Sequence, residues 1–449
     1  MTTAQTHKTA ETSISFGYDT NELNYQQLVF CAALIGIAGG LVATAYYYVL
    51  EACLHMVWHT LPEQLLPFLP ASFPVWNYVW MATTIGGFFV GLTLHFMGLP
   101  GEVAMVVDKV HDPGRIDLRQ TPAMILASLF SITAGGSAGP EAPLVQIIGS
   151  FGGWLSEKLH LTLLNTRVLT FCGMSAALGA FFGAPLGGAL FALEIPHRRG
   201  LEYYEALIPA VLSAILSFFV FRFTTGLTIG GMYHFPAIPE LTLMNLGQGF
   251  LLGVLGALVA ILFVWIFRGI GALVKPMEHH TILLATLGGL SIGLIALAVP
   301  QTLFFGEKEI QEIIQTGSAL GLTMLLMIGF TKMLAIGFTL HSGFRGGFIF
   351  PLFYLGAVFG LAISLSLPQI HPTIAMVCMM AAVNVAITKT PISTTVILSV
   401  LSSTSMVPVI IIASFTSFLL TTQVSLIRTQ RSRTLFPGNP NAEATPAKA

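Results

Sequence analysis

Charged residues are scarce in this sequence. Of its 449 residues, only 9% are Asp, Glu, Lys or Arg, whereas 54% are hydrophobic, and the net charge is −1. A water-soluble domain carries about 25% charged residues, so this chain has too few to cover a surface that faces water. The composition therefore predicts an all-α, polytopic protein that spans the lipid bilayer. Because the net charge is near zero and no basic run occurs, we expect no nucleic acid as a partner.

Cysteines are equally sparse, and they are scattered through apolar segments: Cys31, Cys53, Cys172 and Cys378. This arrangement excludes a disulfide framework and a metal-ligand spacing, so we expect no metal site. We also expect no organic cofactor. The polar residues 1–25 lack the pattern of a cleaved signal peptide, and we expect them to form an N-terminal cytoplasmic segment. Residues 431–449 have the composition of a disordered tail.

Long apolar blocks approach the roughly 20 residues that a helix needs to cross the hydrocarbon core. They cover residues 28–50, 75–96, 206–223, 246–267, 280–299 and 407–426. Other apolar blocks are too short and are broken by Gly and Pro: 124–134, 143–155, 168–182, 185–193, 351–367 and 391–402. Short blocks of this kind predict half-helices that end inside the membrane, where irregular backbone persists only if protein buries it or if it lines a polar cavity.

Two pairs of motifs repeat at nearly the same spacing. The pattern Gly-x-x-x-Pro-Leu occurs twice, with its prolines at Pro143 and Pro351, 208 positions apart. A second pair of Pro-apolar segments begins at Pro185 and Pro391, 206 positions apart. The matching offsets indicate a duplicated unit, although Gly-Pro punctuation is also common by chance in membrane helices.

The duplication suggests a transmembrane domain over residues 26–430 that is divided into two inverted halves. We expect these halves to cover roughly residues 26–230 and 240–430. Duplicated halves with broken helices are typical of secondary transporters, whose substrate site lies where the repeats face each other.

Basic residues cluster in three predicted loops. The positive-inside rule places such loops in the cytoplasm, and we expect both chain termini on that side too. The membrane we expect is the inner (cell) membrane of a bacterium. The clusters are Lys109, Arg115 and Arg119; Arg198 and Arg199; and Arg428, Arg431 and Arg433.

A single carboxylate lies in an otherwise uncharged stretch. Between Gln120 and Ser156, Glu141 is the only acidic or basic residue, and it stands in the motif GPEAP. Glycine lets backbone N–H groups approach a ligand, and proline near a helix start leaves the neighbouring amides unpaired. Two such starts, GPEAP and GFIFP, could therefore hold a bare anion between the two halves. Neither motif contains Lys or Arg, which keeps binding weak enough for release.

Glu141 is predicted to compete with the anion for this site. Ionised, its carboxylate occupies the amide-lined position, whereas a protonated or displaced side chain admits the anion. Burial disfavours the charged form and the helix N-terminus favours it, so we expect proton exchange near physiological pH. The alternative is an ordinary helix N-cap, for which Ser or Thr would be less costly.

These stretches resemble the CLC family of chloride channels and proton-coupled chloride transporters. FMGLP (96–100), GPEAP (139–143) and GFIFP (347–351) stand in the order of the family's three anion-site motifs, and residues 175–194 are similar to the segment behind its gate. The resemblance implies a homodimeric channel or anion/proton exchanger for chloride or a similar small anion, with Glu141 as the gate. It implies anion-binding positions at Met97, Gly98, Leu99, Gly139, Pro140, Ala142, Gly347, Phe348 and Ile349.

Three positions depart from the family pattern. Met97 replaces a Ser, no Tyr follows Tyr354, and Ile195 stands where proton-coupled members often carry a second Glu. Met at the Ser position, together with the missing second Glu, resembles the fluoride-exporting branch, so fluoride/proton antiport is the alternative function. Glu194 is the candidate proton relay, and an interfacial acid at a helix end is its plain interpretation.

The stretch GGSAG (135–139) also fits the Gly-x-Ser-x-Gly nucleophile elbow of hydrolases. That elbow requires a preceding strand, a following helix, a His and an acid. The apolar residues before it are compatible with a strand or a helix, and His341 is the only plausible deep His. We expect no enzyme, and an intramembrane serine hydrolase using Ser137 is the alternative from another class.

Overall fold

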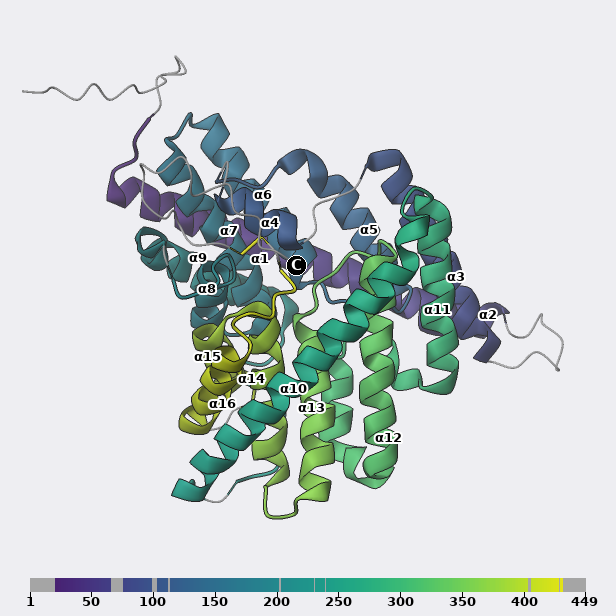
Figure 1. The fold of residues 1–449 in the computed structure, drawn as a ribbon. Helices are drawn as coiled ribbons and strands as arrows, with labels where there is room; N and C mark the ends of the chain where they lie inside the picture. The colour runs from purple at the N-terminus through teal and green to yellow at the C-terminus, as the bar shows by residue number, and fades with distance from the viewer. Residues whose placement is uncertain are drawn as a thin grey trace, which may run out of the picture.

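The fold is built from helices. A computed structural model describes residues 21–65, 76–98, 103–111, 114–201, 203–229, 231–238, 240–402, 405–427 and 429–430. In these ranges the regular structure is helical apart from two isolated β-bridges. Seven helical stretches among the described residues are long and apolar enough to cross a membrane. The predicted all-α, polytopic fold is therefore confirmed (Figure 1).

The helices follow one another in two successive series. The first series is α1 (Tyr25–His55), α2 (Leu61–Leu65), α3 (Trp76–Met97), α4 (Val103–His111), α5 (Thr121–Thr133), α6 (Glu141–Lys158), α7 (Leu163–Phe182), α8 (Pro185–Glu194) and α9 (Leu207–Thr225). The second is α10 (Leu243–Val274), α11 (Thr281–Ala298), α12 (Glu307–His341), α13 (Ile349–Ser366), α14 (Pro372–Thr388), α15 (Pro391–Leu401) and α16 (Val407–Leu420).

The two series repeat the same packing. In the first, α6 packs on α7, and α1 packs on α9; in the second, α13 packs on α14, and α10 packs on α16. The short helices α8 and α15 pack on each other across the two series, and they lie side by side with their neighbours α9 and α16 in Figure 1. The half boundaries near residues 230 and 240 stay a prediction.

Broken helices arise at the same point in each series. Gly183 (φ 64°) ends α7 and Lys389 (φ 62°) ends α14, both in the left-handed conformation. A proline two residues later opens α8 or α15, and its ring fixes a backbone angle suited to a helix start. With 10 and 11 residues, α8 and α15 are too short to span the roughly 30 Å hydrocarbon core.

The core lies around α13 and α14. In α13, 83% of the residues are buried, against 39% in the apolar windows of α10 and α11. A spanning helix without a lipid-facing side must be surrounded by other helices, so α13 lies at the centre of the molecule. This burial places its first residue, Ile349, deep inside the protein.

Several helices differ from the sequence prediction. The blocks 168–182 and 351–367 were predicted to be too short to span, but α7 and α13 have 20 and 18 residues, and α13 is long enough to cross a membrane. The helix α14 was not among the predicted blocks. The long helix α12 was not among the predicted blocks, because its first turns carry Glu307, Lys308, Glu309 and Glu312, and Gly321 (φ 75°) interrupts its helical geometry. The last predicted block ends early, since α16 stops at Leu420 and polar residues follow.

Candidate anion-binding site

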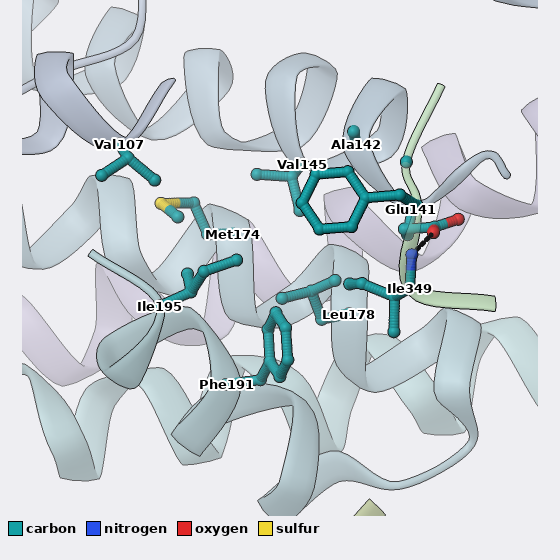
Figure 2. Close-up of a pocket in the computed structure, with 11 residues that line it drawn as sticks. Val107, Glu141, Ala142, Val145, Met174, Leu178, Phe191, Ile195 and Ile349 are labelled. Atoms are coloured by element: carbon teal, nitrogen blue, oxygen red, sulfur yellow. Dashed lines mark hydrogen bonds between the residues drawn. The ribbon is translucent and has the colours of Figure 1, made fainter. Parts of the chain in front are cut away.

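Glu141 lies where two helix starts meet. It is the first residue of α6, it is 1% exposed, and its Oε1 accepts hydrogen bonds from the backbone N–H of Ile349 (2.8 Å) and Phe350 (3.4 Å). Those two residues open α13, so the carboxylate of one series caps a helix of the other (Figure 2). Amides at a helix start have no acceptor within their own helix, and a negative charge is stabilised there.

Proline keeps these amides available. In both helices the third residue is a proline, Pro143 in α6 and Pro351 in α13, and it contributes no N–H. The first intrahelical bonds are made by the next residues: Leu144 N–H donates to the Pro140 carbonyl (3.0 Å), and Leu352 N–H donates to the Phe348 carbonyl (2.9 Å). Each start therefore leaves the N–H groups of its first two residues without an acceptor in its own helix, and those of α13 donate to Glu141.

Gly139 and Gly347 join the two starts directly. Each donates its N–H to the other's carbonyl, at 2.8 Å from Gly139 and 2.7 Å from Gly347, and the pair forms an antiparallel bridge. The Glu141 carboxyl group packs against both glycines. A β-carbon on Gly347 would lie 2.5 Å from Glu141 Oε1, so only glycine fits while the carboxylate is in place.

A small cavity adjoins the carboxylate. It has about 40 Å³ of free space, enough for one or two water-sized particles but not for an organic substrate. Figure 2 shows its walls and the direction of the Glu141 carboxyl group, which points away from the end formed by Val107, Met174 and Ile195. The lining residues are Val107, Glu141, Ala142, Val145, Met174, Leu178, Phe191, Ile195, Gly347, Phe348 and Ile349.

The walls of this cavity contain no Lys or Arg among the described residues. Two buried lysines of the described residues are held by carbonyl groups and do not line this cavity. Lys332 Nζ donates to three carbonyls of residues 302–304, and Lys389 Nζ donates to the carbonyls of Ala386 and Thr421. An anion in the cavity would therefore be stabilised by backbone dipoles rather than by a fixed positive charge.

A second, larger cavity lies beside Pro140, which caps α6, and beside Leu144. It has about 470 Å³ of free space, and we call it the outer chamber. Its walls come from α1, α6, α7, α9 and the start of α12. They include Tyr47, Glu51, Trp58, Phe181, Phe305 and Glu307. Glu141 thus lies between a small apolar cavity and a large chamber.

Glu194, the candidate proton relay, ends α8 and is 1% exposed. Its Oε1 accepts the N–H of Ile392 (3.2 Å), and its Oε2 accepts the N–H (2.9 Å) and the hydroxyl (2.6 Å) of Ser393. These residues open α15, so Glu194 acts as the cap of that helix. Its neighbour Ile195, rather than Glu194, lines the cavity at Glu141.

The first predicted motif lies apart from the others in this structure. Met97 ends α3 and is 46% exposed, Gly98 follows with φ 83°, and neither lines the cavity at Glu141. Leu99 lies outside the described residues. The anion-binding role of these three residues stays a prediction.

The serine hydrolase alternative lacks its geometry. The segment before Ser137 is the helix α5, not a strand, and the Ser137 Oγ has no hydrogen-bond partner among the described residues. The His341 ring packs against Phe267, with 4.2 Å between ring centroids. Within the described residues, the Ser137 hydroxyl is therefore not paired with a histidine, as a nucleophile of this type requires.

Known proteins show where this arrangement belongs. Residues 86–422 match the family described as Voltage gated chloride channel. The chain belongs to this family. The Chloride/fluoride channel protein of Pseudomonas syringae pv. tomato is 29% identical over 366 residues, which cover 79% of this chain and 78% of the relative.

Two solved structures share the voltage-gated chloride channel fold with this chain. One is a CLC-type fluoride/proton antiporter, with a TM-score of 0.78 and 20% identity over 91% of this chain and 100% of that one. The other is a slow cyanobacterial Cl⁻/H⁺ antiporter, with a TM-score of 0.77 and 19% identity over 89% of this chain and 96% of that one. The predicted resemblance to the CLC family is confirmed, and with it a multi-pass membrane protein of an anion-transport family.

Several site residues were missed at the level of sequence. Phe350 supplies the second amide to Glu141, and its place directly before Pro351 was the available signal, because that amide has no acceptor in the first helical turn. The apolar lining residues Val107, Met174 and Phe191 carried no signal, since they resemble the many packing residues of a membrane helix.

Proposed function

We propose that this protein moves chloride or a similar small anion through the site at Glu141, which acts as the gate. A single observation carries the proposal: the Glu141 carboxylate occupies the free amides of the α13 start. A carboxylate and a halide need the same partners there, namely N–H donors and the positive end of a helix dipole. Only one of the two can hold these donors at a time.

Protonation is the step that releases the gate. A carboxylate accepts charge-assisted hydrogen bonds from Ile349 and Phe350, whereas a neutral carboxyl group is a weaker acceptor and is not attracted to the helix start. The neutral side chain then moves aside and an anion takes its place. The absence of a fixed cation from the described cavity walls favours rapid release of that anion.

The two cavities define the direction of the pathway. Asn21, just before α1, is hydrogen-bonded to Leu159 and His160 at the end of α6, on the side where Arg115 pairs with Glu157. The other end of α1 carries Glu51 of the outer chamber. The positive-inside rule assigns the basic side to the cytoplasm, so the chamber opens outward and both termini are cytoplasmic. We also propose a homodimer in a bacterial inner membrane, as the family resemblance implies.

Fluoride is the second candidate substrate. The Pseudomonas relative is named for both chloride and fluoride, and Met97 occupies the position that resembles the fluoride-exporting branch. Backbone amides bind either anion, so the transported ion is identified by measuring chloride and fluoride flux side by side. Proton movement recorded in the same vesicles separates an exchanger, which drives protons uphill, from a channel.

The decisive experiment measures anion efflux from liposomes that contain the purified protein, with chloride and fluoride in parallel and across a range of pH. Glu141→Gln mimics the neutral gate, so its flux is expected to be independent of pH. Glu312→Gln is the matched control, because Glu312 is an exposed acid that does not line either cavity. A Glu141→Gln protein whose flux keeps the pH dependence of the parent would refute the gating role.

A further inference from the structure

The charges of the outer chamber are unusual for an anion pathway. Its walls carry three carboxylates, Glu51, Glu307 and Glu309, and one ammonium group, Lys308. Lys308 Nζ is paired with Glu51, at 3.1 Å from Oε1 and 3.3 Å from Oε2. The charge that remains toward the chamber is therefore negative. Such a field repels anions and raises the local concentration of protons.

The gate needs a source of protons that its own surroundings do not supply. Glu141 is 1% exposed, and its Oε2 accepts no hydrogen bond from the described residues. This oxygen is the one available to receive a proton while Oε1 stays bound to the α13 start. Pro140, which caps α6, and Leu144 in its first turn both line the chamber, so the chamber reaches the residues beside the gate.

Glu307 is the chamber acid best placed to serve the gate. It is the first residue of α12, it is partly buried, and it lines the same chamber as Pro140 and Leu144, which lie next to Glu141 on α6. Glu309 lies two residues further into α12, and Glu51 is paired with Lys308. Several charged or titratable groups lie close enough to Glu307 to interact with it electrostatically. They are Tyr47, Glu51, Glu141, Arg222, Tyr233, Lys308 and Glu309. The chamber wall also carries His55 and His59.

We propose that Glu307 carries protons between the outer chamber and Glu141. A hydronium ion in the chamber protonates the Glu307 carboxylate, the Glu307 carboxyl group passes a proton to Glu141 Oε2 through chamber water, and Glu307 returns to its ionised form. One proton enters and one leaves Glu307, and no electron is transferred. The proposal rests on the gating role of Glu141.

The test follows how quickly anion flux responds after the pH on the chamber side is lowered abruptly in liposomes. Glu307→Gln keeps the shape of the side chain but cannot carry a proton. We expect the response to slow by about tenfold or more. A positioned acid typically contributes roughly hundredfold, but here protons can still reach Glu141 more slowly through water. The steady flux reached at low pH should equal that of the parent. Glu312→Gln should respond at the parent rate.

Chemical rescue separates proton delivery from a purely electrostatic effect. Imidazole is small enough for a 470 Å³ chamber and carries protons, so it should restore the response of Glu307→Gln. Tetramethylammonium supplies positive charge without a transferable proton and should not. If Glu307→Gln fails to fold, Glu307→Ala takes its place in the same rescue assay.

Two results would overturn the relay: a variant as fast as the parent, or a slow variant that imidazole leaves slow. Glu141→Gln is measured in parallel. If that protein loses its pH response while the Glu307 variant behaves as the parent does, the relay fails and the gate stands. If Glu141→Gln keeps its pH response, the gate itself fails.

Discussion

Glu141 and Glu194 are both buried carboxylates that cap a helix of the other series, yet their bonding differs. Glu194 uses both oxygens, which together accept three hydrogen bonds from Ile392 and Ser393. Glu141 uses only Oε1, while Oε2 is without a partner among the described residues. Burial is the same in both, so burial alone does not distinguish a gate from a structural cap. The gating role proposed for Glu141 rests instead on its incomplete hydrogen bonding and on the cavity beside it.

The largest effect is expected from Glu194→Gln, measured as thermal unfolding of the purified protein. In this variant an NH₂ group replaces one of the two Glu194 oxygens. The NH₂ group cannot accept the hydrogen bonds that this oxygen received from the start of α15, so a buried N–H group there loses its partner. We expect a loss of about 2 to 3 kcal/mol in the free energy of unfolding, with the pH dependence of flux retained. Glu141→Gln should lose less stability, because Glu141 accepts hydrogen bonds at only one oxygen, and a neutral side chain that moves aside leaves the amides of Ile349 and Phe350 to an anion or water. Equal losses in the two variants would remove the distinction between gate and cap.

The next effect concerns the glycine that holds the gate in place. In Gly347→Ala the new β-carbon meets only atoms of the Glu141 side chain at closest range, so the carboxylate must move and the backbone need not. We expect flux at high pH to rise about tenfold toward its low-pH level, equivalent to about 1.4 kcal/mol in favour of the open gate. The matched control is Gly247→Ala in α10, where a β-carbon meets nothing within 4 Å. High-pH flux that stays at the parent level would contradict the tight fit at Gly347.

A smaller effect is expected from Ser393→Ala. This change removes the 2.6 Å hydrogen bond from the hydroxyl to Glu194 and leaves both backbone bonds in place. The free energy of unfolding should fall by about 1 kcal/mol, again with unchanged anion flux. An altered pH profile of flux in this variant would connect Glu194 to transport, as the candidate proton relay requires.

The smallest effect is expected from Met97→Ser, measured as halide binding. Met97 is partly exposed at the end of α3, and changes at such positions alter free energies by about 0.5 kcal/mol or less, roughly twofold in affinity. A clearly stronger binding of halide by the serine variant would instead bring this position into the anion pathway, as the family resemblance implies.

Much of this arrangement could be predicted from the sequence. The lone acid at Glu141, the repeated Gly-x-x-x-Pro-Leu pattern and the prolines at the starts of α8 and α15 are local signals, because glycine and proline act on the backbone of their own segment. These signals predict the broken helices, and they predict that GPEAP and GFIFP lie close together.

Other features depend on residues distant in the chain and left no such signal. The cap at Glu194 is visible only when Ser393, 199 positions later, is placed beside it. The outer chamber combines α1 with the start of α12. The charged residues in the first turns of α12 interrupt its apolar pattern, so the sequence does not predict this helix. The role proposed for Glu307 depends on the chamber that α1 and α12 form only in the folded chain.

The paired hydrogen bonds between Gly139 and Gly347 have a mechanical consequence. They fasten the two repeats together at the very point where the ion would cross, so separating the repeats there would break both bonds. These bonds oppose a rigid-body rotation of one repeat against the other. The motion that breaks the fewest contacts is a rotation about the side-chain torsions of Glu141. A cycle built on so small a displacement leaves the scaffold at rest while the ion passes.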